Sequence, residues 1–381
     1  MKIRLNIKSL IIVLLLFLSL FRIYIFSYDE FMNSGIILSL ILILISKPDK
    51  EMIKENIVII IFSLIIFLST YIVKMNTYNF WNGIRYCLQF LALFFVTNRL
   101  VKKDGLKETI KNYYLISLFI VIIFDFTVLI GLEFDKTHYQ NLSTYLFGNK
   151  FALAYLHMQT FGLMVVHDNL NNKKMNYKYI IYCIISIIMC KIVNCFTGIV
   201  GILVISLLLL LPLSDKLKKT LAKPKTIFII LFLIEILLII GKELYDTVFV
   251  QYIIQNILHK GNSLNGRIII YDLLPSVISQ RFLLGYGYNS SIITIILGYG
   301  NAQNGLFQCI LDLGIIGTVV FLINWYKCIN IKFDNKNWAL YCWLYSFMIC
   351  SLVEVCLKFN FFMVLCILFN VGLLQKKEKI N

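Results

Sequence analysis

Residues that could bind or transfer a charged group cluster between 242 and 304, the longest stretch that is neither a strongly apolar run nor a short connector. Arg267 follows Gly266 and precedes the apolar run "IIIYDLLPSVI", and Arg281 comes shortly after that run. A guanidinium group binds phosphate oxygens through two parallel hydrogen bonds, so these arginines are candidates for holding a phosphate or diphosphate. The alternative, favoured for Arg267 on position alone, is an arginine that contacts lipid headgroups.

The same stretch contains a glycine pair and a carboxamide pair. Gly285 and Gly287 in "LLGYGYN" permit a tight turn close to a bound molecule, although a short glycine pair is a weak signal. Gln303 and Asn304 stand directly before the next apolar run. Their side chains can hydrogen-bond a hydroxyl or a phosphate, but they cannot accept a proton as a general base.

The apolar run after Arg267 is interrupted by Asp272 and Pro275, which disfavour a membrane crossing there. We expect an amphipathic helix that lies along the outer membrane interface, with Arg267 near its start. No base is evident in the stretch, and Asp272, Glu243 and His259 are the only candidates.

Ionisable residues also occur inside the apolar runs, where they are costly and therefore candidates for function. They are Arg22, Arg85, Asp125, Lys191, Glu235, Asp312 and Glu354. The alternative is that they reach an interface or pair with one another, and this is the better interpretation for Arg22 and Lys191.

Several types of site are not indicated. There is no acidic pair that would hold a divalent metal on a nucleotide sugar, and no phosphate-binding loop or hydrolase motif. His138 and His259 stand alone, and the ten cysteines are scattered singly. We therefore expect neither a metal nor a cofactor.

Composition predicts an all-α polytopic membrane protein, because 60% of the residues are hydrophobic and only 15% are charged. Residues 1–381 form one transmembrane domain in this prediction. The run 179–212 is too long for one crossing and has basic flanks, so we divide it in two. Twelve spans are predicted, at residues 9–27, 31–46, 57–73, 80–98, 112–132, 151–167, 179–193, 196–212, 226–241, 305–324, 338–354 and 359–374.

The distribution of basic residues predicts the orientation of these spans. One set of alternate connectors, together with both termini, carries 25 of the 36 lysines and arginines, whereas the opposite set carries eight. Basic residues favour the cytoplasmic side, so both termini are predicted to be cytoplasmic. Residues 242–304 then form one large extracytoplasmic loop between spans nine and ten of a cell-membrane protein. The net charge of +16 indicates this orientation rather than nucleic-acid binding.

The order of several segments resembles the O-antigen polymerase and ligase family. The segments are "LFGNKFALAYL", which contains Asn149, "NCFTGIVGILV", "NGRIIIYDLLPSVISQRFLLGYGYN" and "AQNGLFQCILDLGIIGTVVFLIN". The chain departs from the family pattern twice, with Gln303 where a histidine is usual and Cys195-Phe196 where Ser-Arg is usual. Lys191 or Arg85 is the candidate for supplying the missing cation.

The resemblance implies a metal-independent glycosyl transfer between undecaprenyl-diphosphate-linked sugars at the outer face. It implies a catalytic role for Arg267, Gln303 and Asn304, and diphosphate binding for Arg85, Lys191, Gly266, Arg281, Gly285, Gly287 and Asn149. The expected partners are the lipid-linked oligosaccharide and membrane lipid. A chain-length regulator and a flippase are possible further partners. A repeat-unit polymerase is the leading interpretation. The alternatives are a ligase-like transferase, a repeat-unit transporter and an inactive relative.

Overall fold

The computed structural model describes residues 6–73, 77–137, 142–173, 177–240 and 263–378. The predicted outer loop is therefore described only from Ser263 onward, and His138, Glu243 and His259 lie outside the described residues. For residues 263–268 only the backbone is described, so the side chain of Arg267 also lies outside the described part.

The described chain is mostly helical, and a helix overlaps each segment that was predicted to span the membrane, although the first helix ends at Leu20, seven residues before the predicted end of its span. These helices are α1 (Ile7–Leu20), α2 (Tyr28–Ser46), α4 (Ile57–Val73), α5 (Thr77–Asp104), α6 (Leu106–Leu129), α7 (Lys150–Leu170), α8 (Tyr177–Ile192), α9 (Phe196–Leu210), α11 (Pro224–Ile240), α15 (Gly305–Ile329), α16 (Trp338–Ser351) and α17 (Phe359–Lys377). Within the described ranges, five are long and apolar enough to cross a membrane, namely α2, the part of α5 from Phe80, α6, α15 and α17.

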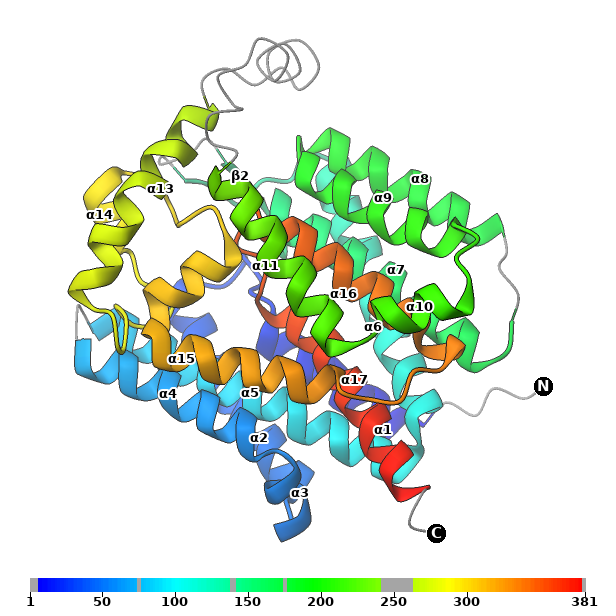
Figure 1. Ribbon diagram of the computed structural model, residues 1–381. Helices are drawn as coiled ribbons and strands as arrows, with labels where there is room; N and C mark the ends of the chain where they lie inside the picture. Colours follow the sequence, from blue (N-terminus) through cyan, green and yellow to red (C-terminus); the bar gives the residue numbers. More distant parts are fainter. Residues whose placement is uncertain (1–5, 74–76, 138–141, 174–176, 241–262, 379–381) are drawn as a thin grey trace.

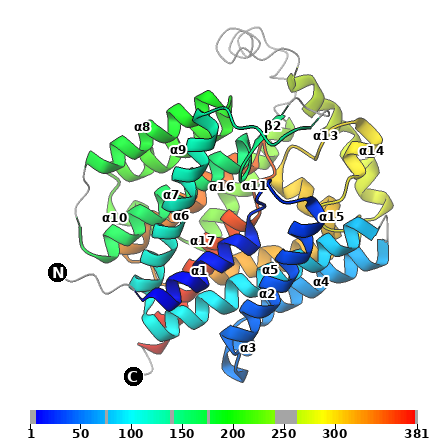
Figure 2. The ribbon, with the colours of Figure 1, turned by 180° about the vertical axis from the view of Figure 1, so that it is seen from behind.

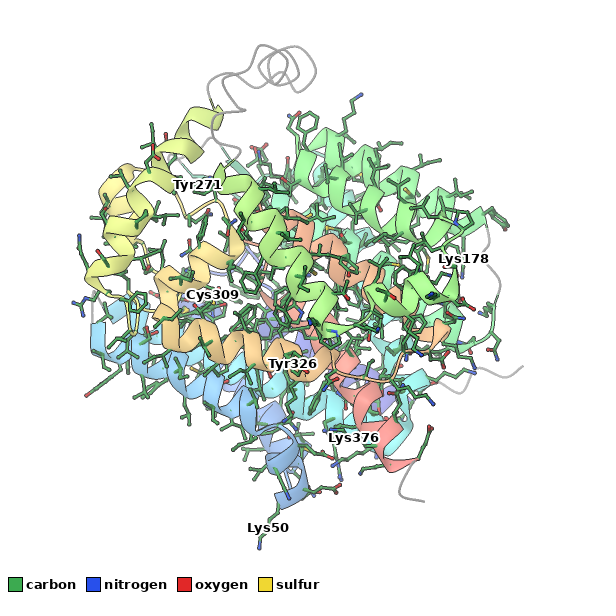
Figure 3. All side chains as sticks on the ribbon, in the orientation of Figure 1. Lys50, Lys178, Tyr271, Cys309, Tyr326 and Lys376 are labelled. Carbon is green, nitrogen blue, oxygen red and sulfur yellow. The ribbon has the colours of Figure 1, made fainter. Side chains whose placement is uncertain are left out.

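The other helices lie at the two ends of this bundle. They are α3 (Lys50–Glu55), α10 (Asp215–Leu221), α13 (Ser263–Gln280), α14 (Ile292–Leu297) and the 3-10 helix η3 (Asn335–Asn337). The start of α1 and the end of α17 lie at one end of the bundle, and α13 and α14 lie at the other (Figure 1, Figure 2). The lysines labelled in Figure 3 lie far from Tyr271 of α13 and Cys309 of α15.

The surface of the bundle differs from that of a water-soluble protein, because many of its exposed side chains are large and apolar. Leu44 of α2, Leu129 of α6 and Leu237 of α11 are each more than 60% exposed. Apolar surface on this scale is unfavourable in water and favourable in a bilayer. The outer faces of the helices are therefore those of a membrane protein.

The C-terminal helices α16 and α17 form the centre of the bundle (Figure 1). Nearly every residue of α16 and every residue of α17 up to Gly372 is buried, including Trp343, Phe347 and Phe362. A helix that is apolar on all sides has to be covered on all sides, and these two are surrounded by other helices. The rings of Phe62 and Phe90 extend this core to α4 and α5, with centroids 5.6 and 4.3 Å from that of Phe362.

The prediction of an all-α fold was wrong in one detail. The connection between α6 and α7 contains a small antiparallel sheet in the order β1 (Asp135–Thr137), β2 (Leu142–Tyr145), β3 (Gly148–Asn149). In its register Asp135 pairs with Thr144, which also pairs with Asn149. The backbone nitrogen of Tyr24 donates to Leu146 at 2.8 Å, so the sheet is tied to the connection between α1 and α2. Strands this short have little periodicity for sequence analysis to detect.

Candidate functional site

A cavity of about 280 Å3 lies where the end of the predicted loop meets the bundle. Part of its lining is aromatic and comes from Phe62 of α4, Tyr288 in the loop, Phe321 of α15 and Phe362 of α17. The polar part of the lining consists of Asn289, Ser290, Ser291, Thr294, Asn301, Gln308, Asp312 and Lys358. An apolar wall with a few convergent polar groups is the usual composition of a small-molecule site.

Asp312 is the acid of this cavity, and it is buried. Its Oδ2 accepts a hydrogen bond from the Asn289 backbone nitrogen at 2.9 Å, and its Oδ1 accepts one from Gln308 Nε2 at 2.8 Å. The Ser290 backbone nitrogen and hydroxyl approach Oδ1 at 3.3 Å. The backbone and amide neighbours are donors, which is the environment that an ionised carboxylate needs. A carboxylate held in this way can accept a proton from the hydroxyl group of a bound molecule.

The position of Asp312 follows from a break in α15. Gly314 has φ 63° and ψ −169° in the middle of the helix, so carbonyl groups just before it cannot make regular helical bonds. The Tyr286 backbone nitrogen donates instead to the Leu311 carbonyl at 2.7 Å, and that of Gly287 donates to the Asp312 carbonyl at 2.9 Å. Backbone groups at membrane depth have to be bonded inside the protein, and the loop segment supplies these bonds.

The predicted tight turn at Gly285 and Gly287 is confirmed, since their φ angles are 68° and 89°. A Cβ atom on Gly285 would lie 2.5 Å from the Gly314 nitrogen, and one on Gly287 would lie 3.3 Å from Thr70 Cα. The glycines therefore allow the loop backbone to approach the broken turn of α15 and the end of α4. Their closest neighbours are protein backbone atoms. The glycines therefore affect the cavity by allowing the contacts that hold Asp312 in place.

Lys358 is a site residue that the sequence analysis did not single out. It is half-buried in the connection between α16 and α17, lines the cavity, and acts electrostatically on Asp312. One signal could have identified it, because a lysine in a short connector on the side with few basic residues departs from the overall charge asymmetry.

Comparison with known proteins gives no relative. No family model matches the chain, and no curated protein or solved structure is significantly similar to it. The function is therefore proposed from the site together with the resemblance found in the sequence.

Asn304 lies beside the cavity with its side chain fully buried, and it caps α15. Its Oδ1 accepts hydrogen bonds from the backbone nitrogens of Leu306 and Phe307, both at 2.9 Å. Its Nδ2 donates to Glu235 of α11 at 2.8 Å and to the Leu352 carbonyl at 3.3 Å. These bonds give Asn304 a positioning role, because they join α15 to α11 and α16. An asparagine directly before a helical run is a common cap, so this role was detectable in the sequence.

The helix predicted after Arg267 is present as α13, which contains Pro275, and its position at the outer membrane interface stays a prediction. Tyr271 of this helix donates to the backbone carbonyl of Gln303 at 3.3 Å, and its ring lies 5.5 Å from that of Phe307. Gln303 is half-buried and has φ 55°, a conformation that non-glycine residues seldom adopt. The helix α13 therefore lies against the segment that opens α15.

Gly266 and Arg267 belong to the second turn of α13. Arg267 is four positions before Tyr271, so the two backbone positions lie one turn apart on the same face of the helix. Arg281 directly follows α13 and is exposed. The structure thus brings the α13 backbone near Gln303, and the side chain of Arg267 is outside the described part.

None of the residues predicted for catalysis or diphosphate binding is in the described lining of the cavity, and three of them have other surroundings. Asn149 caps α7, and its Oδ1 accepts from the backbone nitrogens of Phe151 and Ala152 at 3.1 and 3.3 Å. Lys191 is exposed on α8, which lies across the bundle from α13 and α14 in both views (Figure 1, Figure 2). Arg85 is buried on α5 beside the Tyr86 ring, which lies 4.6 Å from the ring of Tyr288 in the cavity wall.

Another ionisable residue of the predicted spans, Asp125 of α6, pairs with His157 of α7. Its Oδ1 lies 2.9 Å from Nε2 of His157, whose Nδ1 lies 3.0 Å from the Ser186 hydroxyl. This buried cluster joins α6, α7 and α8. Within the described ranges, no group of three His, Cys, Asp or Glu side chains is arranged to hold a metal ion.

Proposed function

We propose that this chain is a polysaccharide repeat-unit polymerase of the cell membrane. It transfers an undecaprenyl-diphosphate-linked glycan chain onto a lipid-linked repeat unit at the outer face, for a capsule, an exopolysaccharide or an O-antigen. In this proposal the chain crosses the membrane twelve times, both termini are cytoplasmic, and residues 242–304 are extracytoplasmic. A flippase and a chain-length regulator are its expected partners.

One observation carries the proposal, namely that Asp312, Lys358 and several amides and hydroxyls line one cavity at the end of the predicted loop. Amide and hydroxyl groups beside aromatic rings suit a sugar, and a lysine suits a phosphate. The cavity of about 280 Å3 is close to the lower limit of roughly 300 Å3 for ligand sites, so it fits the sugar that reacts rather than a whole repeat unit.

The groups of the cavity match the steps of the transfer. The acceptor hydroxyl attacks the anomeric carbon of the donor sugar and forms the new carbon–oxygen bond. The bond from that carbon to the diphosphate breaks, and the diphosphate leaves with its electron pair. Asp312 takes the proton of the acceptor hydroxyl, which fills the role that Gln303 cannot perform. The Lys358 ammonium, together with Arg267 on α13, stabilises the charge of the leaving group.

Two alternatives use the same features differently. A ligase-like transferase would have the same donor chemistry and a different acceptor. A transporter of lipid-linked units is favoured by the break in α15, because transporters often bind their substrates at interrupted helices. The lipid-linked products of a deletion strain separate these cases. Single units at the outer face support a polymerase, full-length chains on the carrier support a ligase, and single units retained at the inner face support a transporter.

Complementation of that strain tests the site. We expect Asp312→Asn to reduce long-chain product by roughly 10²–10⁴-fold, the usual contribution of a general base. Asp312→Glu should retain part of the activity, and Lys358→Met should lower it by roughly 10²-fold or more. Asp215→Asn and Lys332→Met are matched controls, since both residues lie at the end of the bundle remote from α13. Full-length product from Asp312→Asn would exclude the proposed base.

A further inference from the structure

The helix α5 carries a buried arginine that has no counter-charge among the described residues. Arg85 is only 5% exposed, and its Nε and Nη1 atoms have no hydrogen-bond partner in the described part of the chain. Its guanidinium carbon lies 4.5 Å from the ring centre of Phe31 and 4.7 Å from that of Tyr86. Ring faces attract a cation but do not neutralise its charge. A buried cation with unused donors is therefore suited to bind an anion that the described part of the protein does not supply.

The surroundings of Arg85 contain further buried polar atoms that have no partner among the described residues. Gly35 of α2 lies against its side chain, and a Cβ atom there would be 3.1 Å from Arg85 Cδ. One turn earlier on α5, Asn82 donates to the Tyr28 hydroxyl at 2.5 Å, while its own Oδ1 is buried without a partner. One turn later, Gln89 Oε1 is buried without a partner. Polar groups that are left open along one face of α5 indicate space for a ligand or for water.

A second arginine belongs to the same cluster. The guanidinium carbon of Arg22 lies 4.2 Å from the ring centre of Tyr24 and 5.1 Å from that of Tyr28, the residue bonded to Asn82. Its Nε atom is also buried without a partner. The nearest acids in the sequence are Asp29 and Glu30, which are exposed, and Glu30 is used in the capping box of α2.

Arg85 and Arg22 are not in the lining of the Asp312 cavity. The Tyr86 ring, which contacts Arg85, lies 5.2 Å from the Phe359 ring and 4.6 Å from the ring of Tyr288, which does line the cavity. Exposed apolar residues are close to the cluster in the sequence and are called its apolar rim here. Ile25 and Phe26 follow Arg22 and are 65% and 51% exposed, and Trp81 precedes Asn82 and is 49% exposed. A tryptophan beside exposed apolar residues is typical of the membrane–water interface. An anion that reaches the cluster therefore arrives most readily on a lipid.

We propose that Arg85 and Arg22 form a binding site for the phosphate group of a lipid. The planar guanidinium groups supply paired donors to the phosphate oxygens, and the apolar rim contacts the first part of the lipid chain. Phosphate-lipid binding at this site does not require glycosyl transfer. The binding proposal can therefore be tested independently of the proposed function.

The test uses the full-length protein purified into lipid nanodiscs. Thermal unfolding is followed in discs of phosphatidylcholine and in discs that also contain phosphatidic acid or undecaprenyl phosphate. A parallel titration uses inorganic diphosphate with phosphatidylcholine discs. Wild-type protein should unfold at a higher temperature in the phosphate-lipid discs. A free-diphosphate effect of equal size would mean that the site takes its anion from solution, which would overturn the lipid assignment.

Variants then separate binding from packing. Arg85→Gln should lose the lipid-dependent stabilisation and unfold at a higher temperature than wild type in phosphatidylcholine alone, because a buried unpaired charge has been removed. Arg85→Lys should bind the phosphate lipid at least tenfold more weakly, since it keeps the charge without the fork. Arg99→Gln is the matched control, because Arg99 is an exposed arginine on the same helix.

Two results would overturn the proposal. One is lipid-dependent stabilisation of Arg85→Gln equal to that of wild type. The other is an Arg85→Gln protein that is less stable in phosphatidylcholine and keeps its phosphate-lipid preference, which would assign Arg85 to packing. If Arg85→Gln does not fold, Gly35→Ala decides, because its Cβ would lie 3.1 Å from Arg85 Cδ, which shifts the side chain and leaves the charge in place. Unchanged lipid preference in both Gly35→Ala and Arg85→Lys would exclude the site.

Discussion

The contact between the loop turn and the broken helix can be tested with one methyl group. Gly285 has φ 68°, and a Cβ atom there would lie 2.5 Å from the Gly314 nitrogen and 2.6 Å from the Asp312 carbonyl carbon. Neither atom can move away by side-chain rotation, so the turn has to withdraw from α15. The bonds from the Tyr286 and Gly287 nitrogens to α15, at 2.7 and 2.9 Å, are then lost. Two buried bonds that are left unmade cost roughly 2–6 kcal/mol.

Gly298 provides the control for the backbone term. Its φ is 72°, almost equal to that of Gly285, but a Cβ atom there meets nothing within 4 Å. Alanine at either position costs about 1–2 kcal/mol for the left-handed conformation. We therefore expect Gly285→Ala to lower the free energy of unfolding by at least about 2 kcal/mol more than Gly298→Ala.

The measurement is unfolding by sodium dodecyl sulfate in mixed micelles, followed by tryptophan fluorescence, for both variants and wild type. The same preparations are assayed for transfer of lipid-linked sugars. The displaced turn carries the Asn289 nitrogen away from Asp312, so activity should fall with stability in Gly285→Ala only. Equal destabilisation of the two variants would show that the turn does not depend on its contact with α15.

Three further predictions concern other parts of the chain. Asn304→Ala should lower the free energy of unfolding by about 1–2 kcal/mol in the same denaturation assay, because it removes the cap of α15. Burial raises the pKa of Asp168, but hydrogen bonds from Lys178 and a tyrosine lower it by more than burial raises it. The pKa therefore lies below its usual value of 3.8. Its stabilisation is therefore complete above about pH 4 and is lost as the pH falls through the lowered pKa, so unfolding curves of wild type and Asp168→Asn should converge only below about pH 4. Finally, cysteines at the exposed positions Leu283 and Ile316, whose backbones are bonded at 3.3 Å, should cross-link on oxidation without loss of glycan polymerisation. A cross-link that stops the reaction would mean that the break in α15 has to open.

The positions of the helices were accessible from the sequence because long apolar runs bounded by lysines leave few alternatives. The turn at Gly285 and Gly287 could also be predicted, because two closely spaced glycines are a local signal. The partner of that turn could not be predicted, because nothing local to Gly314 indicates that a segment some thirty residues earlier will fill the break. Asp312 was recognised as an unusual charge, but its donors come from that distant segment. Lys358 was overlooked because its role depends on the cavity that three separate parts of the chain enclose.

The break in α15 also bears on the choice between a transferase and a transporter. A gate needs two arrangements of similar free energy, so the contacts that move have to be few or easily exchanged. At Gly314 the opposite holds, because backbone bonds run in both directions between residues 282–287 and 311–316. The Ser69 hydroxyl adds bonds to the carbonyls of both Leu284 and Asp312. Opening this junction would leave several buried backbone groups unpaired at membrane depth, which is strongly unfavourable. A rigid junction holds Asp312 in one orientation toward the cavity, and a fixed carboxylate is what a catalytic base needs and an alternating-access gate does not.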